Sequence, residues 1–264
     1  MISLLAGAWR YRYFILSSIV TEFRSRFIRS RLGGLWMIIN PLAQVAIFSF
    51  VLSGLMGAKL PGINTPFAYA IYLMAGTLGW SLFSEIIARC LTIFIDNGNL
   101  LKKLVFPKIC LPLIVFGSAL LNNLLLFMTM TVLFALLGHV PGITVLWVPV
   151  LALLTAALAF GIGLILGVIN VFIRDIGQAV PITLQLLYWF TPIVYLANVV
   201  GETHRVYLMI NPLYWIVEGF HNILLFGTNP NLKALAAIAL LDLILLLLAF
   251  VVLRRANADV VDAL

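Results

Sequence analysis

Long stretches without a charged residue dominate the pattern of hydrophobic and polar positions along this chain. A helix needs roughly 20 apolar residues to cross about 30 Å of membrane hydrocarbon. No Asp, Glu, Lys or Arg occurs between Lys108 and Arg174, and the turn-forming residues 138–142 divide this stretch into two. Other apolar stretches of sufficient length cover residues 36–57, 66–88, 179–200 and 234–253. The pattern therefore predicts an all-α polytopic membrane protein with six transmembrane helices.

The N-terminal residues 9–31 show a different pattern. Leu16, Val20, Phe23 and Phe27 recur at helical spacing, with Arg, Ser, Thr and Glu between them. A basic amphipathic helix of this kind lies in the plane of the membrane interface. We therefore predict an N-terminal amphipathic interface helix on the inner side of the membrane. An orientation signal alone is the simpler interpretation, and both can hold for the same residues.

Residues 206–226 are apolar enough for a further span, but Asn211 and Pro212 interrupt them, and Glu218 and His221 lie within them. A seventh span would also move the last basic residues of the chain to the outer side. We therefore predict two short re-entrant helices that enter the outer leaflet and return before the last span. Irregular backbone survives at this depth only against protein or a watery cavity, so this segment is a candidate outer gate.

The composition agrees with a membrane protein. Hydrophobic residues make up 64% of the 264 residues and charged residues only 9%, whereas soluble domains carry about 25% charged residues. The mean hydropathy of +1.16 describes a chain that dissolves in lipid rather than in water. A polytopic bundle of this length is expected to be a single membrane domain, residues 1–264.

The positive charge of the chain predicts its orientation. We attribute the net charge of +7 to membrane placement rather than to nucleic-acid binding, because basic residues stay on the inner side and meet anionic lipid. With six spans, the termini share their side of the membrane with Arg10, Arg12, Arg24, Arg26, Arg29, Arg31, Lys102, Lys103, Lys108, Arg174, Arg254 and Arg255. The other side holds Lys59, Arg205 and Lys233. Both termini are therefore predicted to be cytoplasmic.

The sequence shows no pattern for catalysis or metal binding. No G-x-x-x-x-G-K-[ST] loop occurs, so the chain does not hold ATP phosphates in that way. His139, His204 and His221 lack metal-ligand spacing. Cys90 and Cys110 are expected to be small buried residues rather than a disulfide or a metal site. We therefore expect no catalytic residue, cofactor or metal on this chain.

Three charged residues lie in or beside the predicted spans, where charge is costly and marks candidate functional sites. Glu85 and Arg89 are four residues apart, so they can neutralise each other on one helix face. Asp242 stands alone in the last span. It is either a proton or ion site, as in a secondary transporter, or a protonated packing residue.

Gly163 and Gly167 form a small-xxx-small pattern, which Ala159 extends backwards. Small residues at this spacing let another helix approach closely. The partner helix is either in this chain or in a second copy.

Five short segments occur in an order and spacing that cover nearly the whole chain. They are Arg31–Trp36 with Asn40 and Pro41, Asn97–Pro107, Phe172–Gly177, Thr191–Tyr195, and Asn211 with Pro212 before the last span. No single segment is specific for one protein family, but the five segments in this order and spacing are. With this series the chain resembles the membrane subunit of ABC-2 type polysaccharide exporters, especially the O-antigen exporter permeases.

The resemblance implies a homodimer of six-span subunits in the bacterial inner membrane. Each copy would bind a separate ABC ATPase subunit, two in all, and that partner would hold ATP and Mg. The implied substrate is a lipid-linked O-antigen polysaccharide that moves from the cytoplasm to the periplasm. The resemblance also implies that residues 206–226 are outer gate helices.

Site residues also follow from the resemblance. Residues 97–106 resemble the coupling helix that sits in the ATPase cleft. By the same resemblance, Arg174 and Asp175, after the fourth span, form a second contact with the ATPase on the inner side. The implied coupling residues are Asn97, Leu100, Leu101, Lys102, Lys103, Arg174 and Asp175. A polyprenyl pyrophosphate at the entrance would meet the basic residues Arg24, Arg26, Arg29 and Arg31. Solvated charge that faces lipid is the alternative interpretation of these arginines.

Aromatic residues are numerous, and several flank the predicted gate. Aromatic faces with nearby hydroxyls would let a sugar chain slide without tight charged contacts. The candidate substrate-path residues are Trp36, Tyr188, Trp189, Tyr195, Tyr214 and Trp215. Aromatic belts at the membrane interfaces are the alternative explanation.

Three other classes of protein remain open. A capsule or teichoic-acid exporter shares the expected fold, and so does an ABC-2 exporter of a small drug or lipid, which would have a narrower and less aromatic path. A secondary transporter would use Asp242 and Glu85, but it requires inverted repeats with broken spans at matching positions. The sequence shows no such symmetry.

Overall fold

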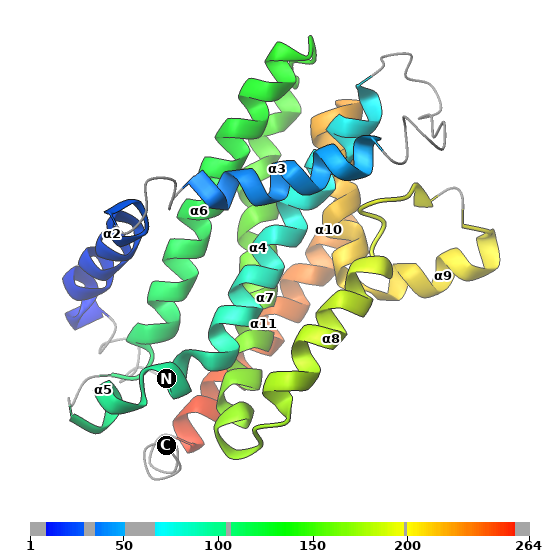
Figure 1. The fold of residues 1–264 in the computed structure, drawn as a ribbon. Coiled ribbons are helices and arrows are strands. Elements are labelled where there is room, and N and C mark those ends of the chain that lie inside the picture. The colour runs from blue at the N-terminus through cyan, green and yellow to red at the C-terminus, as the bar shows by residue number, and fades with distance from the viewer. Residues whose placement is uncertain (1–8, 29–34, 51–66, 104–106, 198–199, 257–264) are drawn as a thin grey trace.

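The computed structural model describes residues 9–28, 35–50, 67–103, 107–197 and 200–256, and most of them are helical. In chain order the elements are α2 (Arg12–Ile28), α3 (Trp36–Ser49), α4 (Ala68–Asp96), α5 (Gly98–Lys103), α6 (Cys110–Leu136), η3 (Ile143–Trp147), α7 (Val148–Phe172), α8 (Ile176–Trp189), α9 (Glu202–Ile210), α10 (Pro212–His221), the π-helical turn η5 (Asn222–Phe226) and α11 (Leu232–Arg255). The long helices form one bundle (Figure 1). The all-α prediction is confirmed for the described residues.

Four helices in the described part of the chain are long and apolar enough to cross a membrane. They are α4, α6, the stretch Ile143–Phe172 that joins η3 to α7, and α11. These helices match the predicted spans at residues 66–88, on either side of residues 138–142, and at 234–253. In Figure 1, α5, the α7–α8 turn and the C-terminal end of α11 lie together at one end of the bundle.

The predicted first and fifth spans coincide with shorter helices. The described part of the first is α3, which has 14 residues and lies across α4 and α6 (Figure 1). Residues 51–66 lie outside the described residues. The fifth coincides with α8, which also has 14 residues. At 1.5 Å per residue α8 is about 21 Å long, which is shorter than the hydrocarbon core.

The predicted fifth span is too long at its outer end because a proline follows α8. The helix ends at Trp189 rather than at residue 200. Pro192 has no N–H to donate and disfavours helical backbone at Thr191. The apolar residues after Trp189 form turns instead. An apolar run alone does not separate a helix from a buried turn.

The structure has a helix, α2, within the predicted residues 9–31, and α2 packs along α6. Its place in the membrane interface stays a prediction. Ile19 is buried in this contact, and a Cβ at Gly117 of α6 would overlap the Ile19 side chain. Leu16 and Val20 are 58% and 49% exposed. Two members of the predicted apolar stripe therefore face away from the bundle, and Ile19 makes the contact that holds α2 on α6.

The most extensive helix contact joins α4 and α7 through two glycines. A Cβ at Gly163 would lie 3.0 Å from Cys90 Cβ and 3.3 Å from Ile87 Cα. A Cβ at Gly167 would overlap the carbonyl oxygen of Cys90. The small-xxx-small pattern therefore packs a helix of the same chain, and the two backbones approach without side chains between them.

Gly167→Ala is expected to destabilise the bundle, because the new methyl group would push the Cys90 backbone away from α7. Overpacking of this kind costs about 1–3 kcal/mol. The purified variant should unfold at a lower temperature in detergent than the native protein. Gly142→Ala is the matched control, because no atom lies within 4 Å of a Cβ there. Equal unfolding temperatures for the two variants would contradict the close packing.

Candidate functional site

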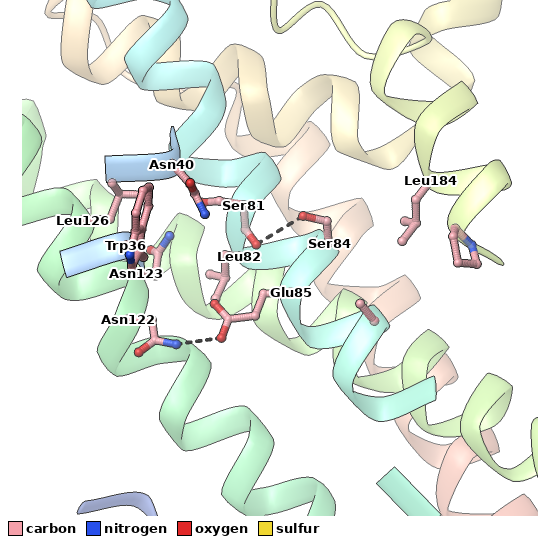
Figure 2. A pocket seen from close by; sticks show the side chains of 12 residues that line it. Trp36, Asn40, Ser81, Leu82, Ser84, Glu85, Asn122, Asn123, Leu126 and Leu184 are labelled. Atoms are coloured by element: carbon pink, nitrogen blue, oxygen red, sulfur yellow. Dashed lines mark hydrogen bonds between the residues drawn. The ribbon is translucent and has the colours of Figure 1, made fainter. Parts of the chain in front are cut away.

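A cavity of about 580 Å³, with a mostly apolar wall that also carries polar side chains, lies between α3, α4, α6 and α8 (Figure 2). Leu82, Leu126 and Leu184 form part of its wall. The lining residues that carry polar or indole groups are Trp36, Asn40, Ser81, Ser84, Glu85, Asn122 and Asn123. Polar side chains in the middle of apolar spans are costly in a membrane. Their gathering around one cavity marks a candidate functional site.

Two amides of α6 bind α4 at the level of the cavity. Asn122 Nδ2 donates to Glu85 Oε1 at 2.6 Å, and Figure 2 shows these side chains pointing toward each other. Asn123 Nδ2 donates to the Leu78 carbonyl oxygen at 2.9 Å. Because a buried amide without a partner is costly, these bonds fix both side chains and hold α6 beside α4.

An arginine next to the cavity joins three helices. Arg89 of α4 donates to Glu22 of α2 at 2.7 Å, to the Ser118 hydroxyl of α6 at 2.8 Å, and to Glu85 at 3.3 Å. The predicted pair of Glu85 and Arg89 is therefore confirmed. The sequence did not indicate the contacts with α2 and α6, which come from residues far away in the chain. Arg89 thus ties α2 to the helices that carry the cavity.

The turn that follows α8 is held by a tyrosine of α4. Tyr72 Oη donates to the carbonyl oxygens of Pro192 and Tyr195 at 3.0 and 2.8 Å. The Tyr72 ring stacks on the His221 ring of α10, with 3.7 Å between the ring centroids. A Cβ at Gly76 would lie 3.0 Å from His221 Nε2, so this contact needs a glycine on α4. The turn and α10 are therefore both anchored on the same helix.

The predicted gate segment contains two short helices, α9 and α10, which meet at Asn211. The Asn211 side chain accepts a hydrogen bond from the Leu213 N–H at 3.0 Å, which caps α10. Its Nδ2 donates to Thr191 Oγ1 at 3.0 Å. The segment begins at Glu202, ahead of the predicted residue 206. Asn211 therefore joins the start of α10 to the turn after α8.

The π-helical turn η5 is bound by the connection between α6 and α7. His139 Nε2 lies 2.6 Å from the carbonyl oxygen of Leu224, and Thr144 Oγ1 donates to that of Ile223 at 3.1 Å. A π-helical turn leaves the regular helical hydrogen-bond pattern, so such carbonyls need other partners. These two bonds attach the end of the gate segment to the bundle.

Trp36 is the predicted substrate-path residue that lines this cavity, and it is 49% exposed. Tyr188, Trp189 and Tyr195 lie around the end of α8. The Tyr188 and Trp189 rings meet edge to face at 5.7 Å, and Tyr195 Oη donates to the Trp189 carbonyl oxygen at 2.9 Å. The structure therefore separates Trp36 from the aromatic group at the turn.

The remaining two predicted path residues belong to the gate segment. Tyr214 is fully buried, and its role in a substrate path stays a prediction. Its hydroxyl accepts from Arg205 at 3.4 Å and donates to Glu218 at 3.5 Å. Burial raises the pKa of the Glu218 carboxyl, and the charge of Arg205 opposes this rise. Trp215 Nε1 donates to the Met209 carbonyl oxygen at 3.0 Å, which joins α10 to α9.

The predicted coupling segment follows α4 directly. Asn97 Nδ2 donates to the Ile93 carbonyl oxygen at 2.8 Å and ends α4, and α5 starts at the next residue. Leu101 is buried and Leu100 packs against the core, whereas Lys102 is exposed. The leucines hold α5 on the bundle and leave the lysine available to a partner.

The residues of the second predicted inner contact lie near the same end. Arg174 and Asp175 are exposed in the α7–α8 turn, close to the level of α5 in Figure 1. Arg24 is exposed on α2. Several predicted positions lie outside the described residues, namely the side chains of Lys103 and Arg26, residues 104–106, Arg29 and Arg31.

Asp242 of α11 is buried, and neither of its carboxylate oxygens has a hydrogen-bond partner among the described residues. It does not belong to the described lining of the cavity. Both interpretations of Asp242, an ion site and a packing residue, stay predictions.

Most of the cavity was missed by the sequence analysis, although the sequence carries a signal for it. Ser81, Ser84 and Glu85 share one face of α4, because residues three and four apart are neighbours on a helix. Asn122 and Asn123 interrupt an apolar helix. Polar residues at the centre of two neighbouring spans are therefore the pattern that indicates the cavity.

Residues 14–225 match the ABC-2 type transporter family, and the chain belongs to this family. It is a multi-pass transmembrane permease subunit, and it has no ATPase domain within the sequence described above. The resemblance found in its short segments is therefore confirmed.

Several relatives cover most of the chain. The O-antigen export system permease protein RfbA of Klebsiella pneumoniae is 27% identical over 211 residues, which cover 78% of each chain. The protein of the same name from Myxococcus xanthus is 29% identical over 248 residues, or 93% of each chain. The polysialic acid transport protein KpsM of Escherichia coli is 29% identical over 202 residues, or 75% of each chain. Similar identities to both kinds of protein do not fix the substrate.

Arg89→Gln is expected to loosen α2, because a neutral amide cannot form the ion pairs with Glu22 and Glu85. Hydrogen bonds to charged groups contribute about 1.5–3 kcal/mol. Hydrogen exchange followed by mass spectrometry should therefore show faster exchange of the α2 amides in this variant. Arg254→Gln, at the exposed end of α11, is the control and should leave these rates unchanged. Native exchange rates in Arg89→Gln would show that the cluster does not hold α2.

Proposed function

We propose that this chain is the permease subunit of an ATP-driven exporter that moves a lipid-linked O-antigen polysaccharide from the cytoplasm to the periplasm. The cavity between α3, α4, α6 and α8 carries the proposal. Its hydroxyl, amide and carboxylate groups match the hydroxyls of a sugar as hydrogen-bond partners. The indole of Trp36 offers a flat apolar surface for a sugar ring. The relatives are named for O-antigen export and polysialic acid transport, and these names support a polysaccharide as the substrate.

The proposed exporter is a homodimer with two ATPase subunits in the bacterial inner membrane. α3 and α8 border the cavity, and one face of α8 is apolar and exposed. Ile182, Leu186 and Trp189 on this face are 62%, 58% and 54% exposed. A second copy against this side would cover the apolar face and close the cavity into a path between subunits. The proposal counts α3 and α8 as the first and fifth of six spans in each copy.

The ATPase partner would bind at the end of the bundle that carries α5. Lys102 on α5 and the pair Arg174 and Asp175 in the α7–α8 turn are exposed there. In this proposal that end and both termini face the cytoplasm, as the basic residues indicate. ATP and Mg belong to the partner, which supplies the driving free energy. The permease supplies a path with two conformations whose populations the partner shifts.

A push on α5 would reach the path through α4, because α5 starts where α4 ends. α4 carries Ser81, Ser84 and Glu85 at the cavity and Tyr72 at the turn after α8. A displacement of this one helix would therefore change the cavity and the attachment of the gate segment together. We propose that α9 and α10 are re-entrant gate helices at the outer side and that α9–α10 moves with this turn.

The entrance would lie near α2 in the inner membrane interface. The basic residues Arg24, Arg26, Arg29 and Arg31 would bind the pyrophosphate of the lipid carrier, because arginine matches phosphate oxygens in charge and geometry. Arg89 ties α2 to the cavity-bearing helices through Glu22. A carrier bound at α2 would therefore stand beside the path into which its polymer is fed.

Export of a capsule polymer is the second candidate function. It is favoured by the similarity to KpsM, whose name describes polysialic acid transport. The same fold, partner and cavity would serve either polymer.

Disruption of the gene in its host tests the proposal. Cells without the permease should lose O-antigen from their surface and accumulate lipid-linked polymer inside. Both pools can be measured in one culture, by surface immunodetection and by extraction of the lipid-linked fraction. A plasmid copy of the native gene should restore the surface polymer and empty the internal pool. An unchanged surface without an internal pool would contradict polysaccharide export.

A further inference from the structure

A groove of about 470 Å³ lies between α9, α10 and the first part of α11. Its described lining shares no residue with that of the cavity between α3, α4, α6 and α8. We propose that this groove binds one phospholipid with a net negative charge, whose phosphate meets Lys233 and one of whose acyl chains lies along α11. The inference goes beyond the proposed function, because it does not depend on the exported polymer.

Lys233 stands at the membrane depth of lipid phosphates. It belongs to the first turn of α11, one of the helices long and apolar enough to cross a membrane. The C-terminal end of α11 lies beside α5 (Figure 1), and the 24 residues of the helix place its first turn about 36 Å away. Long basic side chains near the end of a span extend to the membrane interface. The Lys233 ammonium group is therefore placed among the headgroups of the leaflet opposite to α5.

The α11 wall of the groove has a charged end and an apolar length. Ala234, Ala237, Ile238 and Leu241 recur at helical spacing, so they share one face of α11. Lys233 stands at the N-terminal end of this face. From Lys233 to Leu241 the helix rises roughly 12 Å, most of the hydrocarbon depth of one leaflet, which is about 15 Å. A phospholipid has the same order, with a phosphate followed by a hydrocarbon chain.

The wall opposite to α11 is apolar and held in place. Trp215 Nε1 donates to the Met209 carbonyl oxygen at 3.0 Å, which fixes the indole as part of this wall. Ile210, also in the lining, is 75% exposed and offers its side chain to hydrocarbon. On α11, the small side chains of Ala234 and Ala237 leave the groove open. A mostly apolar lining with few polar groups, in a volume within roughly 300–1,000 Å³, is typical of a small-molecule site.

The charge of the groove selects the headgroup. Lys233 is the one charged residue among the described residues of the lining. It is exposed and forms no ion pair with another described residue. Asn231, also in the lining, has amide N–H groups that can donate to a phosphate oxygen. A lysine at the membrane surface attracts anionic lipid, whereas a zwitterionic lipid would bring its own ammonium group toward Lys233.

The test uses the purified full-length protein in phosphatidylcholine vesicles that contain one of two probes. The probes are phosphatidylglycerol, which is anionic, and phosphatidylcholine, and both carry the same photoactivatable group on an acyl chain. Mass spectrometry after illumination gives the labelling of Ala237 and Leu241 in the groove. The readout is the ratio of labelling by the anionic probe to labelling by the zwitterionic probe. The native ratio should be about five-fold, and it should be near one at Met128, which is 53% exposed on α6.

Four variants assign the effect to the charge and to the groove. Lys233→Gln should lower the ratio to near one, whereas Lys233→Arg should keep it. Arg254→Gln removes a cation from the exposed other end of α11 and should leave the ratio at its native value. Ala237→Leu fills the groove and should reduce the labelling of Leu241 by both probes, with the labelling of Met128 unchanged. Equal unfolding temperatures of native protein and Lys233→Gln would show that the loss of the charge leaves the fold intact.

The outcomes that would overturn the inference do not involve export. A native ratio near one in the groove, or a ratio that stays high in Lys233→Gln, would show that Lys233 does not select an anionic lipid. Absence of labelling by both probes would show that another part of the protein or a second copy covers the groove. Displacement of the anionic probe by less unlabelled polyprenyl pyrophosphate than unlabelled phosphatidylglycerol would assign the groove to a carrier lipid instead.

Discussion

The close packing of α4 against α7 is the contact on which the rest of the structure depends. Gly163 and Gly167 of α7 let the two backbones meet at Ile87 and Cys90 of α4. Because this contact involves one face of α4, it fixes the rotation of α4 about its own axis. This rotation decides where its other faces point. Tyr72 reaches the turn after α8, Glu85 faces the cavity, and Arg89 reaches α2. A side chain at either glycine would change all three positions at once.

This arrangement gives the permease one element that runs from α5 to the contact with α10. α5 begins directly after α4, and the aromatic contact with His221 lies near the other end of α4. Packed helices transmit displacement because their contacts do not compress. We infer that an ATPase acting on α5 needs no separate relay to reach the cavity and the gate segment.

The main helices of the fold could be predicted from the sequence, because apolar length decides which helices span a membrane. The outer end of α8 could not, since its apolar residues continue past Trp189 into turns that Pro192 and the bonds to Tyr72 impose. The pair of Glu85 and Arg89 follows from helical spacing. Its links to α2 and α6 depend on tertiary packing. Residue type alone also did not separate Trp36, which lines the cavity, from Tyr214, which is buried.

The proposed function requires that the polysaccharide passes the cavity between α3, α4, α6 and α8. A photo-crosslinking amino acid in place of Ser84, in cells that make the polymer, tests this claim most directly. The same group in place of Leu243, which is 54% exposed on α11, is the control for lipid-facing positions. If the polymer passes the cavity, illumination attaches glycan to the permease at position 84 and not at position 243. Glycan attached at neither position, or equally at both, would contradict this claim.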